Sequence, residues 1–139
     1  MSMEDQLEIA AAAREALEAL HGDFMASVRS LKEPKVNGAE FRCVDGELEA
    51  ICIGIRLRTR HRLVARGGML ELLEYTFIVE DAGEAVPIWS IYLSPNRRLY
   101  SDAALENALC DMTNQYLPSR VAPHLASKLL ASEVFAPRA

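Results

Sequence analysis

The stretch CIGIRLRTRHRLVAR, residues 52–66, decides the fold because every second residue from Arg56 to Arg62 is an arginine. Side chains of a β-strand point alternately to the two faces of a sheet, so this spacing predicts a strand with one charged face. We interpret residues 47–60, ELEAICIGIRLRTR, as one long strand. Its other face is expected to be apolar and to consist of Ile51, Ile53, Ile55 and Leu57.

Turn signals on both sides of this stretch predict three more strands. The Asp-Gly pair at 45–46 follows a first strand over residues 39–44 and is a strong two-residue hairpin signal. The Gly-Gly pair at 67–68 leads into a strand over residues 69–80, and the last strand covers residues 85–93. Because no helical pattern interrupts these segments, we expect a four-stranded antiparallel meander.

The alternation of apolar residues also predicts how these strands align. Keeping the apolar faces together places Arg56 opposite Glu74 and Glu74 opposite Tyr92. Opposite charges that face each other across strands stabilise a sheet by roughly 0.2–1 kcal/mol per pair. The arginine row is therefore expected on the outer face, away from the helix that covers the apolar face.

Helices are expected before and after the strands. Residues 4–31 carry apolar side chains at spacings of three and four, and their alanine-rich first half has a high helix propensity. Two further helices are predicted over residues 102–117 and 121–133, with Pro118 ending the first of them. The expected fold is a single α+β domain, residues 1–139, with a long N-terminal helix packed on a four-stranded antiparallel meander and two C-terminal helices.

Charge and hydropathy exclude several classes of protein. The net charge of −5 argues against a nucleic-acid-binding protein, because phosphate contacts need a surplus of lysine and arginine. Glu4, Asp5 and Glu8 occur where a signal peptide needs a positive start, and no apolar run is long enough to span a bilayer. We expect a cytoplasmic protein that binds neither nucleic acid nor a membrane.

Cysteines and histidines give no sign of a metal or cofactor site. Cys43, Cys52 and Cys110 form no CxxC pair and are interpreted as buried free thiols of a reducing compartment. The three histidines, His21, His61 and His124, lie far apart in the chain and lack the spacing of metal ligands. The sequence therefore predicts no metal and no cofactor.

The arginine row has three interpretations, of which a nucleic-acid surface is disfavoured by the net charge of −5. It can be the solvated face of a strand, with carboxylates as charge partners. Alternatively, Arg56, Arg58 and Arg60 can hold a small anionic ligand together with Tyr92, in a cleft between the sheet and the C-terminal helices.

A second feature is expected at the other end of the arginine face. If residues 47–60 are one strand, Leu48, Ala50 and Cys52 lie on the same side as the arginines. Apolar residues of the neighbouring strands join them there, and the expected interface consists of Cys52, Ile78, Val86 and Ile88. Monomers rarely leave such a patch uncovered, so either the C-terminal helices or a second molecule must cover it.

No catalytic motif accompanies these features. The chain contains no Gly-rich phosphate loop, nucleophile elbow or metalloprotease helix motif. We therefore expect a non-catalytic protein–protein interaction module that forms a homodimer. The alternative is a small anionic-ligand-binding protein or enzyme that uses Arg56, Arg58 and Arg60.

Overall fold

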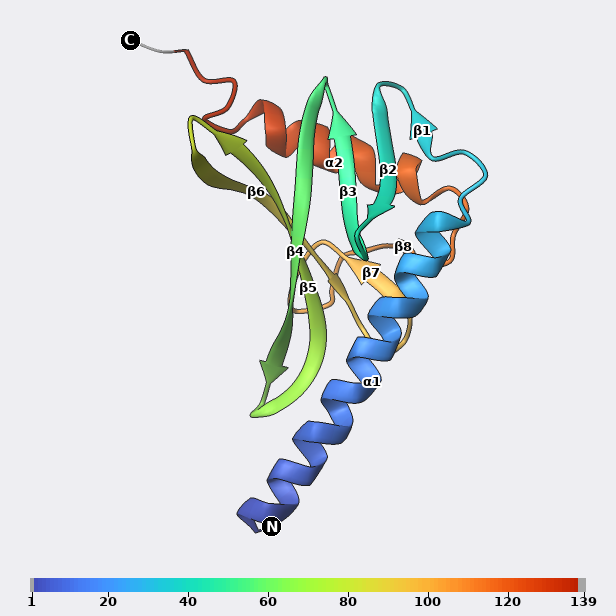
Figure 1. The fold of residues 1–139 in the computed structure, drawn as a ribbon, viewed down its shortest axis with the longest axis vertical. Coiled ribbons are helices and arrows are strands. Elements are labelled where there is room, and N and C mark those ends of the chain that lie inside the picture. Colours follow the sequence, from blue (N-terminus) through green and yellow to red (C-terminus); the bar gives the residue numbers. More distant parts are fainter. Residues whose placement is uncertain (1, 138–139) are drawn as a thin grey trace.

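The computed structural model describes residues 2–137 and contains an antiparallel sheet, with one helix before it and one helix after it in the chain (Figure 1). Within these residues the elements are α1 (Met3–Arg29), β1 (Lys35–Val36), β2 (Ala39–Val44), β3 (Glu47–Cys52), β4 (Ile55–Arg66), β5 (Met69–Asp81), β6 (Glu84–Leu93), β7 (Arg98–Tyr100), β8 (Ala108–Asp111) and α2 (Leu117–Leu130). The eight strands are hydrogen-bonded in chain order. The α+β class is confirmed, but the four-stranded sheet and the pair of C-terminal helices are wrong.

Five tight hairpin turns join β1 to β6, and two of them account for strands that were not expected: β1, and the division of residues 47–60 into β3 and β4. At each of the five turns both turn residues have positive φ, as type I′ turns require, and the twist of such turns matches that of the strands they join. These turns are Asn37-Gly38, Asp45-Gly46, Ile53-Gly54, Gly67-Gly68 and Ala82-Gly83. The third turn is hidden in the sequence, because a β-branched residue such as Ile53 seldom adopts positive φ.

The Ile53-Gly54 turn changes which side chains share a face. Because the turn has two residues, Cys52 lies opposite Ile55 and Ala50 lies opposite Leu57. Cross-strand partners point to the same side of a sheet. Leu48, Ala50 and Cys52 therefore lie on the inner face with Leu57, and their expected placement beside the arginines is wrong.

The same turn shifts the register of the following hairpin. Strand β4 begins at Ile55 and runs to Arg66, so Arg62 lies opposite Glu74, whereas Arg56 faces Ile51 of β3. The expected pair of Arg56 with Glu74 is thus wrong. The pairing of Glu74 with Tyr92 across β5 and β6 is confirmed.

One apolar core joins both helices to the inner face of the sheet. The second half of α1 supplies the buried residues Leu17, Leu20, Phe24, Met25 and Val28. Helix α2 supplies Leu117, Val121, Ala122, Leu125 and Leu129. Neither helix is long and apolar enough to cross a membrane.

Side-chain hydrogen bonds explain why residues 102–117 are not a helix. The Asp102 carboxylate accepts the backbone N–H groups of Glu106 and Asn107, and Asp111 accepts that of Thr113. Such bonds compete with the helical pattern, and they lower the pKa of Asp102 and of Asp111. The segment instead forms turns and β8.

Helix α2 starts earlier than the last helix expected from the sequence. Pro118 does not end a helix but lies in the first turn of α2, where the missing N–H is tolerated. One helix therefore replaces the two that were expected.

Replacing Ile53 by asparagine is expected to stabilise the protein by about 1 kcal/mol, since positive φ costs a β-branched residue about that much. The change creates Asn-Gly, the preferred pair for this turn. Urea unfolding of the wild type and of Ile53→Asn measures the effect. Gly54→Ala, at φ of 72°, is the control and must destabilise. A loss of stability in Ile53→Asn would contradict the turn assignment.

Candidate functional site

The outer face of β4 carries the arginines singled out in the sequence. The Arg56 Nε donates to Glu49 at 2.6 Å, and the Arg62 Nε donates to Glu74 at 2.7 Å. Arg58 is paired with Glu80. These pairs support the interpretation of the row as a solvated strand face with charge partners.

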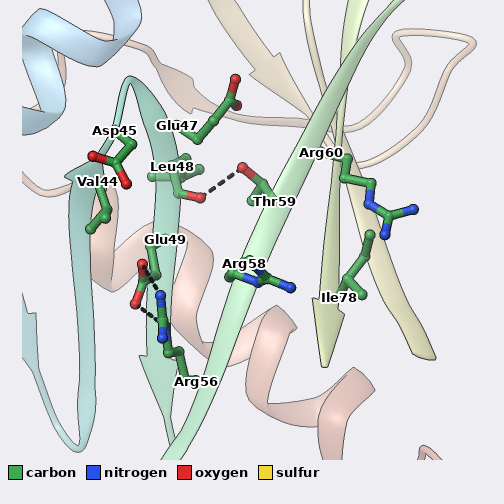
Figure 2. Close-up of a pocket in the computed structure, with 10 residues that line it drawn as sticks. All are labelled: Val44, Asp45, Glu47, Leu48, Glu49, Arg56, Arg58, Thr59, Arg60 and Ile78. Atoms are coloured by element: carbon green, nitrogen blue, oxygen red, sulfur yellow. Dashed lines mark hydrogen bonds and ion pairs between the residues drawn. The ribbon is translucent and has the colours of Figure 1, made fainter. Parts of the chain in front are cut away.

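Arg60 differs from its neighbours because it has no hydrogen-bond or ion-pair partner among residues 2–137. It lines a cleft of about 320 Å³ at the point where β3 and β4 separate (Figure 2). The Thr59 hydroxyl donates to the Leu48 carbonyl at 2.7 Å at this point. The cleft is lined by three arginines and three acidic residues, so their formal charges cancel: Arg56, Arg58, Arg60, Asp45, Glu47 and Glu49.

Tyr92 lies at a different place on the outer face. It is opposite Glu74, which in turn is opposite Arg62. Arg62 follows Arg56 by six positions of β4, which corresponds to about 20 Å along a strand. The structure therefore does not bring Arg56 and Tyr92 into one ligand site.

The residues of the expected interface do not share a surface. Cys52 is buried in the core and, with Ala122 of α2, lines a pocket between the helix and the sheet. Ile78 lies on the outer face opposite Arg58, whereas Val86 lies on the inner face opposite Val79. Ile88 falls where the β5–β6 register shifts. The hidden turn and this bulge separate residues that simple alternation placed together.

Glu49 is a buried carboxylate on the outer face, with a side chain that is only 3% exposed. Arg42 donates to its Oε1 at 2.8 Å from one side, and Arg56 donates from the other. Burial alone would raise the pKa of Glu49, but the hydrogen bonds from the two arginines outweigh it and lower this pKa. Figure 2 shows Arg56 lying along the Glu49 carboxylate.

The lowered pKa of Glu49 predicts a pH dependence of stability. The ionised group stabilises the fold above its unfolded pKa, about 4.3, and this contribution is lost as the pH falls through the lower folded pKa. We expect Glu49→Gln to be less stable than the wild type at pH 7, with a difference that shrinks below about pH 4. Urea midpoints of both proteins between pH 7 and pH 3 measure this. A difference that is independent of pH would contradict the ion-pair interpretation.

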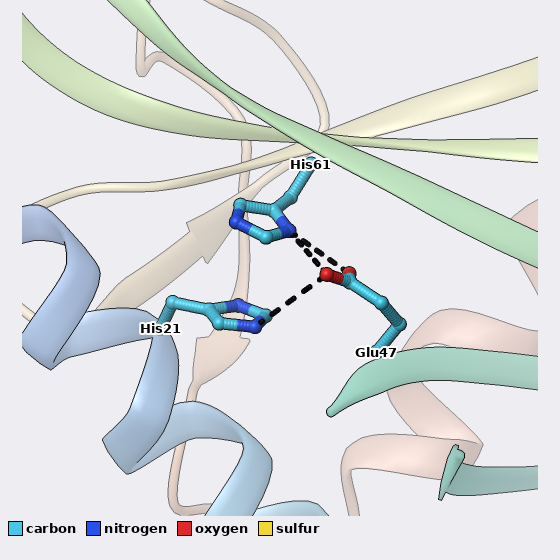
Figure 3. Close-up of side chains that lie close together, drawn as sticks. All are labelled: His21, Glu47 and His61. Carbon is cyan, nitrogen blue, oxygen red and sulfur yellow. Dashed lines mark hydrogen bonds and ion pairs between the residues drawn. The ribbon is translucent and has the colours of Figure 1, made fainter. Parts of the chain in front are cut away.

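A second cluster lies on the inner side of the sheet, between α1 and the strands (Figure 3). The rings of His21 and His61 are stacked, with centroids 4.0 Å apart and an interplanar angle of 14°. The His61 Nδ1 lies 2.8 Å from the Glu47 carboxylate, and the His21 Nδ1 lies 2.8 Å from the Tyr75 hydroxyl. Four elements thus meet in one polar cluster: α1, β3, β4 and β5.

Hydrogen bonding fixes the proton positions on these rings. The His21 Nε2 lies 2.8 Å from the Gly46 carbonyl, which can only accept, so Nε2 carries a hydrogen, and in this tautomer of the imidazole Nδ1 accepts from Tyr75. Burial and the nearby carboxylates Glu47 and Glu18 raise the pKa of Tyr75 and keep its hydroxyl protonated. The Glu47 carboxylate likewise requires the His61 Nδ1 to donate.

Sequence spacing missed this cluster because forty positions separate its two histidines. A signal was present in the strand alternation, since His61 follows Leu57 and Thr59 on the inner face. His21 likewise falls among the buried residues of α1. His124 is not part of the cluster and stacks on Trp89 instead.

The N-terminal half of α1 carries exposed apolar side chains. All its buried residues come from Leu17 onward, whereas the Met3 and Leu7 residues are 85% and 72% exposed. Figure 1 shows this half projecting past the tip of the β4–β5 hairpin. Beside it, Ile9 and Ala13 of the helix and the exposed Met69 of the hairpin line a groove.

No family model, curated protein or solved structure matches the chain.

Proposed function

We propose that the protein is a non-catalytic interaction module that forms a homodimer through the N-terminal half of α1. The observation that carries the proposal is the apolar stripe of this helix. Its buried part includes Leu17, Phe24 and Val28, whereas a second stripe nearer the N-terminus, turned partly away from the buried face, consists of Met3, Leu7 and Ala10, of which Met3 and Leu7 are exposed. A half-helix of this length is marginal in water by itself, so a partner that covers the stripe would stabilise it.

The spacing within the stripe favours a second helix as the partner. Met3, Leu7, Ala10 and Arg14 alternate steps of four and three, which is the pattern of a helix–helix seam. An antiparallel pair that sets Leu7 against Ala10 of the second copy brings Arg14 beside Glu4 of that copy. The helix thus complements itself in shape and charge, and twofold dimers are the commonest oligomers.

The test compares two exposed leucines. Leu7→Glu should convert the dimer to a monomer in sedimentation equilibrium, because it places a charge at the centre of the seam. At concentrations where the wild type is also monomeric, the thermal midpoint of Leu7→Glu should equal that of the wild type, since Leu7 is already exposed. Leu130→Glu, at a leucine of α2 that is 59% exposed, is the control and should remain dimeric. A wild type that is monomeric at every concentration overturns the proposal.

A charge swap tests the antiparallel arrangement. Arg14→Glu should weaken association, and the double variant Glu4→Arg, Arg14→Glu should restore it, because the opposite charges are exchanged rather than lost. A double variant as weak as the single one would exclude this register, while the Leu7→Glu result would still decide whether the helix mediates association.

A second candidate function rests on Arg60, the arginine of the cleft without a partner among the described residues. We expect a small anion in the cleft to raise the thermal midpoint. Inorganic phosphate and dicarboxylates are the probes, with Arg60→Ala as the test variant. Arg62→Ala, which removes an arginine held by Glu74, is the control and should keep the response. A screen without any shift in the wild type excludes this function.

A further inference from the structure

We propose that His21, His61 and Glu47 form a binding site for a divalent transition-metal ion, with Zn²⁺ as the first choice. Each residue offers one ligand atom, and these atoms lie within 4.8 Å of one another. Two imidazoles and one carboxylate are a donor set that binds Zn²⁺ and leaves a fourth position open. The three ligands come from α1, β3 and β4, so the ion would connect the helix to the sheet.

The geometry identifies the ligand atoms. The His61 Nδ1 lies 2.8 Å from Oε1 of Glu47, and the His21 Nε2 lies 3.9 Å from the same oxygen. These are the two nitrogens that face the carboxylate in Figure 3.

The opposite nitrogens also have partners. The His21 Nδ1 contacts the Tyr75 hydroxyl, and the His61 Nε2 lies 3.9 Å from Glu18. Metal-bound histidines commonly donate their second N–H to such a group, which orients the ring and raises its basicity. The His21 ring therefore has a hydrogen-bonded outer partner already in place, and Glu18 lies within ion-pairing distance of the His61 ring.

The charges around the cluster favour a cation. Within residues 2–137, neither Glu18 nor Glu47 has an arginine or lysine within ion-pairing distance, and the two histidines are their only charge partners there. Both rings are mostly buried, where electrostatic attraction is stronger than in water.

Binding requires a defined rearrangement. The ion must lie in the plane of each ring about 2.0–2.1 Å from its nitrogen, so the stacked rings must rotate apart. The His21 proton moves from Nε2 to Nδ1, which ends the hydrogen bond to the Gly46 carbonyl and reverses the one to Tyr75. The His61 proton moves from Nδ1 to Nε2, toward Glu18. In each ring the proton moves from one nitrogen to the other and is not released.

Calorimetric titration of the metal-free protein with Zn²⁺ tests the proposal. We expect one equivalent per chain, with affinity at least 100-fold weaker in His61→Gln and about 10-fold weaker in Glu18→Gln, which lacks only the outer partner. His124→Gln is the matched control and should bind like the wild type, because this histidine stacks on Trp89 instead. Circular dichroism confirms that each variant is folded.

A Co²⁺ titration distinguishes this site from one that uses the free cysteines. Nitrogen and oxygen ligands give visible d–d bands without the near-ultraviolet charge-transfer band of a thiolate. The proposal is overturned if no metal binds at one equivalent, if His124→Gln weakens binding as much as His61→Gln, or if a thiolate band appears. Neither the Zn²⁺ titration nor the Co²⁺ titration depends on the oligomeric state, so the proposed metal site is tested independently of the proposed dimer.

Discussion

Replacing Phe24 by alanine should lower the free energy of unfolding by about 3–5 kcal/mol, the usual cost of emptying a buried aromatic site. Phe24 is fully buried in α1, and its ring forms a T-shaped pair with the Tyr75 ring at a centroid distance of 5.2 Å. The substitution removes both the buried area and this aromatic contact. Urea unfolding followed by circular dichroism measures the effect.

The matched control for Phe24→Ala is Leu130→Ala. Leu130 is also a helical apolar residue, but it is mostly exposed, so its truncation should change stability by no more than about 0.5 kcal/mol. Equal losses in the two variants would mean that the second half of α1 does not pack on the sheet. Such a result would also remove the contact that places His21 beside Tyr75.

Replacing Leu125 by alanine should cost about 2–5 kcal/mol, because this residue of α2 is fully buried against the inner face of the sheet. The variant also tests what covers Cys52. In the wild type, Cys52 is buried and burial raises the pKa of its thiol, so labelling by a thiol reagent should be slow. Loosening α2 should speed the labelling of Cys52.

The other two cysteines provide internal references for this experiment. Cys43 and Cys110 are half-buried, so the expectation that all three thiols are buried is wrong for them. Burial raises the pKa of Cys110 to about 11, which keeps it slow, and Cys43 should react first. Rapid labelling of Cys52 in the wild type would show that α2 does not cover it.

Local patterns in the sequence predicted several elements correctly. The apolar spacing of the first thirty residues indicated α1, and the alternation after Gly54 placed the arginines on the outer side of β4. The Asp45-Gly46 and Gly67-Gly68 turns were visible because these residue pairs adopt positive φ easily. Each of these features depends on neighbouring residues alone.

The errors arose where a local signal was weak or misleading. Ile53 disfavours the turn it occupies, so the alternation predicts one strand where the structure has β3 and β4, and the predicted faces of residues 48–52 are reversed. The helix expected over residues 102–117 had an apolar stripe, but the hydrogen bonds of Asp102 and Asp111 satisfy the backbone in another way.

The candidate sites, unlike the strands and the first helix, depend on contacts between residues that are distant in the sequence. The sequence by itself determined the α+β class, the long first helix, the antiparallel strands and an outward row of arginines, because helix and strand periodicity are properties of adjacent residues. Only the tertiary structure decided that Glu49 is enclosed by Arg42 and Arg56, and that His21 stacks on His61 beside Glu47. The physical reason is that such contacts depend on strand register and helix docking. The tight turn at Ile53-Gly54 fixes the register of β3 and β4 and so decides which of their side chains share each face of the sheet.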